Sequence, residues 1–222
     1  RATDVKRLDK LLNVDHDAWD GTPIRMSQVD IDAVYDKDPA VFRQNLSTLT
    51  DQLTANNISV VALQAFADTD GDGNVDKVYF HNDVIPVEVD AFNAVGNAIL
   101  QQGIDVVAWM PSLTYQPFVK ADGSNLVTSK GEKGWYRRIS PFDQDAVNKA
   151  AELFRELAKY TPAEGILFQD DLYLNDHEDY SAYGKAAYEE AFGTPLDALQ
   201  KDDTEQMQKW TRLKTKRLTE VS

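Results

Sequence analysis

The chain has 222 residues, 42% of them hydrophobic, which is enough for one large domain with a buried core. Its formal net charge of −14 argues against binding to nucleic acids or anionic membranes, because affinity for phosphate groups comes largely from Lys and Arg. With no cysteine in the chain, the redox compartment cannot be inferred from the sequence. No apolar run approaches the ~18 residues of a membrane span. The acidity therefore serves either solubility alone or a cationic partner.

Neither end of the chain carries the usual signals of a protein terminus. The opening "RATDVKRLDK" has no initiator Met and no apolar signal region. The closing "QKWTRLKTKRLTEVS" stops inside a helical pattern without a stop signal. The sequence therefore predicts a piece of a longer protein.

The first predicted strand is "MSQVDIDAVY", at 26–35. It carries Asp30 and Asp32 two residues apart, so both carboxylates point to one face. Buried carboxylates are costly unless they are paired or face water, so a wet cleft explains them better than a dry core. A helix follows, with Asp38 as its N-cap and Pro39 at its first position.

The second predicted strand, "ISVVALQAFA" at 58–67, carries Gln64 and Phe66 on one face and leads directly into "DTDGDGNVD". With Asp68 as position 1 of an EF-type calcium loop, Gly73 takes the glycine position, but position 12 is Tyr79 instead of a bidentate acid. We therefore expect a tight turn at the rim of the cleft without a firmly bound metal. A calcium-stabilised structural domain is the alternative.

A helix is predicted at about 86–102, ending at Gly103. The third predicted strand, "DVVAWMPSL" at 105–113, has Trp109 near its end. The long segment 114–139, which includes Tyr115, follows this strand. Long loops at the carboxyl ends of parallel strands are usually functional.

The third helix is predicted from Ser140, with Pro141 next and Asp143 close to a capping-box position. The fourth predicted strand is "GILFQDD", at 165–171. The segment after it is rich in carboxylates, and no Lys or Arg occurs from 160 to 184. A last helix is predicted from about Asp203.

Four strand–helix repeats predict parallel strands with right-handed crossovers, hence an α/β sheet or a (β/α) barrel. Chemistry in such folds gathers at the carboxyl ends of the strands. We therefore expect one cleft to be lined by Asp30, Asp32, Asp68, Trp109, Asp170 and Asp171.

Charge along the chain is uneven: nine carboxylates and one cation, Lys77, lie between residues 44 and 119. Aromatic residues are interleaved with them. Aromatic faces stack on sugar rings and carboxylates bind ammonium groups, so this mixture suits a sugar with amino groups. The aromatic residues are Phe66, Tyr79, Phe80, Trp109 and Tyr115.

The strings "VDIDAVYD", "LQAFADTDGDGNVDKVYF", "VVAWMPSL", "SPFD" and "GILFQDD…NDHEDYS" resemble one family in order and spacing. The family is the PgaB-type (HmsF-type) poly-β-1,6-N-acetylglucosamine N-deacetylases, in their C-terminal domain, from about residue 24 onward. The resemblance implies a TIM-barrel-like glycoside hydrolase fold, of which residues 1–222 hold about the first half, four strands of eight. The family's N-terminal deacetylase domain and its metal site have no counterpart in these residues. Gln169 stands where family members tend to have His.

The resemblance also implies a function and a location. The family domain binds, and in some members cleaves, partly de-N-acetylated poly-β-1,6-N-acetylglucosamine during export of biofilm polysaccharide. Its members are periplasmic and often associated with the outer membrane, where an export porin is an expected partner. The polymer is cationic, in accord with the acidic chain, and no cofactor is implied.

Glycoside hydrolysis needs a carboxylic acid that protonates the leaving oxygen. We expect Asp170 and Asp171 to supply it, although adjacent strand residues face opposite ways. Parity with Gln169 favours Asp171, whereas a twist at the strand end favours Asp170. The alternative function is a non-catalytic module that guides the polysaccharide to the export pore. The expected substrate-binding residues are Asp30, Asp32, Gln64, Phe66, Asp68, Trp109, Tyr115 and Asp176; no metal ligand is expected.

Overall fold

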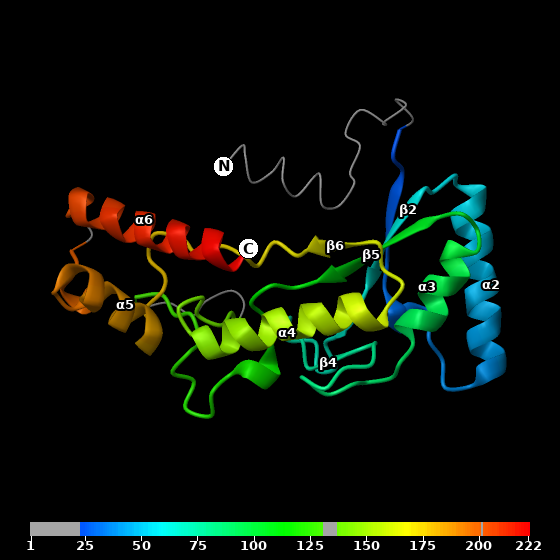
Figure 1. Ribbon diagram of the computed structural model, residues 1–222, viewed down its shortest axis with the longest axis horizontal. Coiled ribbons are helices and arrows are strands. Elements are labelled where there is room, and N and C mark those ends of the chain that lie inside the picture. The colour runs from blue at the N-terminus through cyan, green and yellow to red at the C-terminus, as the bar shows by residue number, and fades with distance from the viewer. Residues whose placement is uncertain (1–22, 131–136, 201) are drawn as a thin grey trace.

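The computed structural model of the chain describes residues 23–130, 137–200 and 202–222. Its centre is a sheet of four parallel strands in the order β1-β2-β5-β6, with helices between consecutive strands (Figure 1). The predicted alternation and parallel pairing are thus confirmed. The strands are β1 (Met26–Val29), β2 (Val60–Gln64), β5 (Asp105–Met110) and β6 (Gly165–Phe168), and the helices between them are α2 (Pro39–Ala55), α3 (Phe92–Leu100) and α4 (Gln144–Tyr160).

The two faces of the sheet differ in composition. Alternate residues such as Leu63 and Ala108 are buried on the face covered by α3, which contacts β2 and β5. On the other face Gln64, Trp109 and Leu167 lie side by side, because Gln64 pairs with Trp109 and Trp109 pairs with Leu167. This row crosses three strands at the carboxyl edge and combines a polar, an aromatic and an apolar side chain.

The strands are shorter than predicted, because local hydrogen bonds divert the chain. After β1 the short helix η1 (Ile31–Ala33) forms, with the N–H of Ala33 donating to the carbonyl of Asp30 at 3.2 Å. After β2 the chain continues as β3 (Phe66–Ala67), which pairs antiparallel with β4 (Lys77–Val78). The Asp/Gly-rich turn therefore joins two strands of a small ribbon at the carboxyl edge.

Two helices begin later than predicted. The carbonyl of Pro86 accepts from the N–H of Val78 at 3.0 Å, so this segment pairs as extended chain and α3 starts at Phe92. Helix α4 starts at Gln144 because the carboxylate of Asp143 accepts from the Asn125 side chain at 2.9 Å instead of capping a helix that begins at Ser140. The predicted caps Asp38 and Asp203 are confirmed, as is the end of α3 near Gly103, where φ is 72°.

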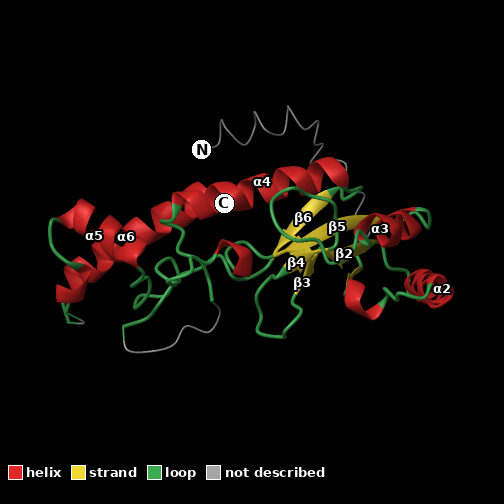
Figure 2. Cartoon of the chain, turned by 90° about the horizontal axis from the view of Figure 1, so that it is seen from below, coloured by secondary structure: helices red, strands yellow, loops and turns green. Residues whose placement is uncertain are grey.

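A second, smaller core lies beyond the sheet. It is formed by α5 (Ala182–Phe192), η3 (Leu196–Ala198) and α6 (Thr204–Val221), which pack around the buried indole of Trp210. In both views α4 extends from the sheet toward these two helices (Figures 1 and 2). None of the helices in the described ranges combines the length and hydrophobicity needed to cross a bilayer.

Candidate active site at the carboxyl edge of the sheet

Asp32, in η1 just after β1, is held by two side chains, one from β2 and one that follows β4 directly. The phenol of Tyr79 donates to its Oδ1, and Nε2 of Gln64 donates to its Oδ2 at 3.5 Å. Partial burial of its carboxyl group raises the pKa of Asp32, and the hydrogen bond from Gln64 opposes this rise. These two hydrogen bonds therefore fix the orientation of the Asp32 carboxylate at the carboxyl edge of the sheet.

Further carboxylates surround Asp32. Asp30, Asp68 and Glu88 lie close enough for their negative charges to raise the pKa of Asp32 further. Lys77, the single cation between residues 44 and 119, is paired with Glu88 at 2.5 Å. The structure thus brings Asp30, Asp32 and Asp68 together, and their combined charge favours a bound cation.

Gln64 presents an acceptor without a partner. The residue is only 7% exposed, and its Oε1 accepts no hydrogen bond within the described ranges. A buried acceptor left unpaired costs free energy. Since Nε2 of the same amide contacts Asp32, an ammonium or hydroxyl group bound beside that carboxylate is also near Gln64.

An aromatic pair lies next to this polar group. The rings of Phe66 and Trp109 meet edge to face, with centroids 4.9 Å apart and an interplanar angle of 76°. Trp109 is half-buried and pairs in register with Gln64. Its ring can therefore stack on a sugar whose polar substituents reach the carboxylates.

At the end of β6, Asp170 and Asp171 differ sharply in environment. Asp170 is exposed, whereas Asp171 is fully buried. The Asp171 carboxylate accepts from the backbone N–H groups of Ser112, Leu113 and Thr114 at 2.6–3.0 Å and from the Thr114 hydroxyl at 3.1 Å. Burial raises the pKa of Asp171 above its ordinary value, and these hydrogen bonds only partly oppose the rise.

The segment from Asp68 to Asp76 is the ordered turn that the sequence predicts. Asp68 accepts from the N–H groups of Gly71 and Gly73, each at 2.8 Å, and Asp76 accepts from the Thr69 hydroxyl at 2.6 Å. The carboxylates of Asp68, Asp70 and Asp76 approach within 4.8 Å of one another. The absence of a bound metal stays a prediction, which a calcium titration of thermal stability tests.

Two expected binding residues lie away from the group around Asp32. Tyr115 is fully buried; its phenol donates to the carbonyl of Pro111 at 2.5 Å, and its ring packs against Phe118. The prediction that Tyr115 lines the cleft therefore needs correction, because the ring belongs to the core behind the edge. Asp176 is exposed on the loop after β6 and accepts from the Thr211 hydroxyl at 3.1 Å.

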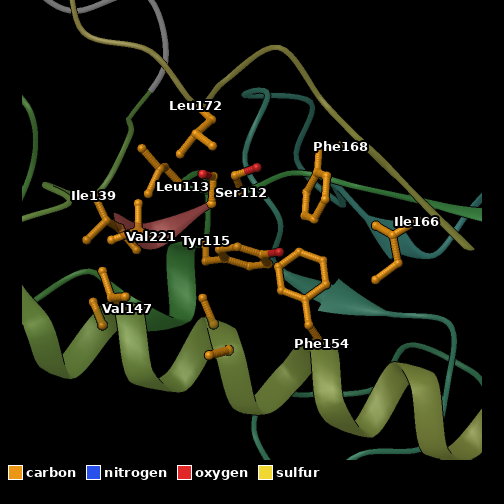
Figure 3. A pocket seen from close by; sticks show the side chains of 14 residues that line it. Ser112, Leu113, Tyr115, Ile139, Val147, Phe154, Ile166, Phe168, Leu172 and Val221 are labelled. Carbon is orange, nitrogen blue, oxygen red and sulfur yellow. The ribbon is translucent and has the colours of Figure 1, made fainter. Parts of the chain in front are cut away.

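Tyr115 borders an apolar cavity of about 330 Å³ (Figure 3). Its walls are α4, β6, the loop after β5 and the last residues of α6. Ile139, Val147, Phe154 and Phe168 line it (Figure 3). The cavity is on the helix side of β6, and among the described residues no Asp or Glu side chain lines it. It is therefore distinct from the acidic edge, the group formed by Asp30, Asp32 and Asp68.

The sequence did not indicate the partners of the two carboxylates. Tyr79 reaches Asp32 from 47 positions away, and the N–H groups of 112–114 reach Asp171 from a neighbouring strand end. Neither contact has a periodic signal. The apolar run around Tyr79 after an Asp/Gly turn is the sequence signal for a return strand.

Comparisons with known proteins support a glycoside hydrolase relationship. The model of a hypothetical glycosyl hydrolase family, family 13, matches residues 28–222. The poly-β-1,6-N-acetyl-D-glucosamine N-deacetylase of Escherichia coli K12 is 34% identical over 208 residues, covering 90% of this chain and 31% of that protein. The chain thus spans about a third of the length of this curated relative.

Solved structures agree with this relationship. The PgaB (BpsB) glycoside hydrolase domain from Bordetella bronchiseptica matches with a TM-score of 0.74 and 37% identity, over 90% of this chain and 61% of that one. α-L-Fucosidase isoenzyme 2 from Paenibacillus thiaminolyticus matches with a TM-score of 0.59 and 12% identity, over 89% of this chain and 30% of that one, a likeness of fold alone. The parallel sheet described above is therefore part of a TIM-barrel-like glycoside hydrolase architecture.

Proposed function

The chain belongs to the hypothetical glycosyl hydrolase family 13, and from this membership we propose that it binds and hydrolyses partly de-N-acetylated poly-β-1,6-N-acetylglucosamine. The observation that carries the proposal is the carboxyl edge of the sheet, where Asp30 and Asp68 lie near Asp32 and where Gln64, which donates to Asp32, pairs with Trp109. A partly deacetylated polymer supplies both the ammonium groups and the apolar sugar faces that such an edge recognises. The name of the Escherichia coli relative supports this choice of polymer.

In the proposed complex, the ammonium of a glucosamine unit binds the carboxylate of Asp32, which Nε2 of Gln64 helps to orient. The sugar ring stacks on the indole of Trp109. Phe66 packs edge to face against that indole and holds it in place. Asp30, Asp68 and the exposed Asp176 contribute further negative charge along the polymer. Charge-assisted hydrogen bonds of this kind are about twice as strong as neutral ones.

Asp170 is the proposed acid, because its carboxyl group is exposed at the end of β6. It donates a proton to the glycosidic oxygen as the bond from that oxygen to the anomeric carbon breaks. The oxygen of a water molecule bonds to the anomeric carbon, and the proton that this water releases passes to solvent, from which Asp170 is reprotonated. Asp171, with its oxygens engaged by residues 112–114, is not the donor in this scheme.

Asp32 is assigned to binding rather than to catalysis. Its carboxylate already accepts hydrogen bonds from Tyr79 and Gln64, and further carboxylates lie close to it. Such a group suits a bound ammonium ion. In this scheme Asp32 therefore recognises the ammonium group, and Asp170 supplies the proton.

The family resemblance adds a setting to the proposal. We propose that the protein processes an exported polysaccharide in the periplasm, associated with the outer membrane and beside an export porin. The second candidate function uses the same edge without cleavage: a carbohydrate-binding module that guides the cationic polymer toward the pore. Asp170 is exposed after β6, the strand next to the one that carries Trp109, and this position favours hydrolysis over the alternative.

The test measures the chain length of partly deacetylated polymer before and after incubation with the protein. We expect shorter products from the unchanged protein and at least a 100-fold slower reaction with Asp170→Asn. The matched control is Asp105→Asn, an exposed carboxylate at the opposite end of β5. Retained binding without any shortening by the unchanged protein would support the guiding module instead.

A further inference from the structure

Asp171 occupies a cage built by a neighbouring strand end. Its carboxylate has no exposure to solvent, and the three consecutive N–H groups of Ser112, Leu113 and Thr114 point at it. Successive backbone N–H groups that converge in this way form an anion-binding concavity. The occupant of this concavity is a side chain of the protein itself.

Further hydrogen bonds stabilise the loop after β5, which contains residues 111–115. The phenol of Tyr115 donates to the carbonyl of Pro111, and the hydroxyl of Thr114 adds one more hydrogen bond to Asp171. The loop follows directly on Trp109 and Met110, which end β5. Asp171 therefore joins the end of β6 to the end of the strand that carries the proposed stacking platform.

Asp170 lies between two such anchors. On one side the N–H of Gln169 donates to the carbonyl of Met110 at 2.9 Å; on the other the side chain of Asp171 is caged. The backbone of Asp170 is thus tied to β5 through both of its neighbours. A backbone fixed in this way limits the positions that the Asp170 carboxyl group can reach, and an acid catalyst requires such placement.

We propose that Asp171 is a positioning residue, whose carboxylate ties residues 112–114 to the end of β6 and so places Asp170 against the glycosidic oxygen. This inference rests on the proposed function, in which Asp170 is the proton donor. Asp171 itself touches no substrate, because its side chain is buried and its oxygens are engaged by the loop. Its effect on the reaction passes through Asp170.

The experiment compares Asp171→Asn with Asp170→Asn on two substrates. One is the partly deacetylated polymer; the other is a dinitrophenyl glycoside of a short β-1,6-linked oligomer, whose leaving group departs without protonation. We expect Asp170→Asn to slow the polymer reaction at least 100-fold and the aryl glycoside reaction only a few-fold. Asp171→Asn should follow the same pattern, with kcat on the polymer lowered 10- to 100-fold, KM within about 2-fold, and the aryl glycoside rate nearly kept.

A second variant guards against a failure of Asp171→Asn to fold. Thr114→Val keeps the shape of the side chain and removes one donor to Asp171. It should lower kcat on the polymer several-fold and leave the aryl glycoside rate unchanged. Asp105→Asn, at the far edge of the sheet, should leave both rates unchanged.

Equal losses on both substrates would mean that Asp171 supports the fold only, and an unchanged polymer rate would mean that it has no role; either result overturns the inference. If Asp170→Asn cleaves the polymer at the normal rate, the proposed acid is wrong and the placement of Asp170 fails with it. If the unchanged protein cleaves neither substrate, the proposed hydrolysis fails separately. Hydrogen exchange then tests whether Asp171 anchors the loop. The amides of 112–114 should exchange at least 10-fold faster in Asp171→Asn, and equal rates would overturn the inference.

Discussion

Among single residues, Asp32 combines a raised pKa with a proposed role that needs its charge. Burial and the neighbouring carboxylates make protonation of Asp32 easier than that of an ordinary aspartate. Its ionised form binds an ammonium group, so affinity for partly deacetylated oligomers should rise with pH as Asp32 loses its proton. Isothermal titration calorimetry between pH 4 and pH 7 measures this rise.

The Asp32→Asn variant separates this residue from the other carboxylates. A hydrogen bond to a charged group contributes about 1.5–3 kcal/mol, so the variant should bind the oligomers roughly ten-fold or more weakly at pH 7. Its affinity should also depend less on pH than that of the unchanged protein. An unchanged pH profile would assign the dependence to other groups.

Lys214 shows the opposite kind of shift. Its side chain is 2% exposed and donates to the carbonyls of Asn175 and Glu178. Burial lowers the pKa of Lys214 from 10.5 to about 8, although Asp176, Glu178 and Asp179 oppose this shift. Between these two values the unfolded chain binds more protons than the folded one, so the stability of the folded protein increases with pH.

A Lys214→Met variant lacks this titration and serves as the reference. The free energy of unfolding of the unchanged protein, relative to the variant, should rise by roughly 3 kcal/mol as the pH goes from 7.5 to 10.5, at 1.36 kcal/mol per pKa unit. Urea unfolding at a series of pH values measures the difference. A constant difference would show that Lys214 titrates normally.

For the elements, the sequence predicted well wherever the signal was local. Asp38 before Pro39 located the start of α2, and apolar runs located the parallel strands. The ribbon of β3 and β4 escaped prediction because each of its strands has only two residues. Helix α5 escaped prediction although Ser181 and Gly193 flank it as good caps, because its sequence AYGKAAYEEAF has no clear apolar stripe.

Helix α5 offers a prediction in which packing overrides propensity. Replacing a helical glycine with alanine usually stabilises a protein by about 1 kcal/mol. At Gly184, however, a Cβ atom would lie 2.4 Å from the carbonyl oxygen of Asp179. Gly184→Ala should therefore destabilise the protein, by about 1–3 kcal/mol as for other overpacked sites.

Gly96 in α3 is the matched control. There a Cβ atom would meet the Pro162 ring at 3.4 Å, a distance that needs little adjustment. Gly96→Ala should therefore be neutral or slightly stabilising. Thermal unfolding of both variants tests the contrast, and a more stable Gly184→Ala protein would show that α5 shifts freely against the loop before it.

Across the whole molecule, the sequence predicted which strand ends share an edge but not which side chains meet there. Parallel alternation alone places Asp32, Trp109 and Asp170 at the carboxyl edge. The burial of Tyr115 and Asp171 depends instead on the path of the loop after β5. No local pattern encodes that path, because it is set by contacts between residues more than 50 positions apart.

The negative charge of the molecule should make its preference for deacetylated oligomers depend on salt. The chain carries −14, and at the acidic edge Asp30, Asp32 and Asp68 lie together with Lys77 already paired. Such a field concentrates a polycation near the edge, and added salt screens it over a distance of about 10 Å at 0.1 M ionic strength. We therefore expect partly deacetylated oligomers to bind at least ten-fold more tightly than fully acetylated ones at low salt. This preference should shrink steadily as sodium chloride is raised from 20 to 500 mM, because screening weakens the ammonium contacts and leaves stacking on Trp109. Titration calorimetry with both oligomers across this range measures the preference. Equal affinities at low salt would show that the edge does not recognise the ammonium group.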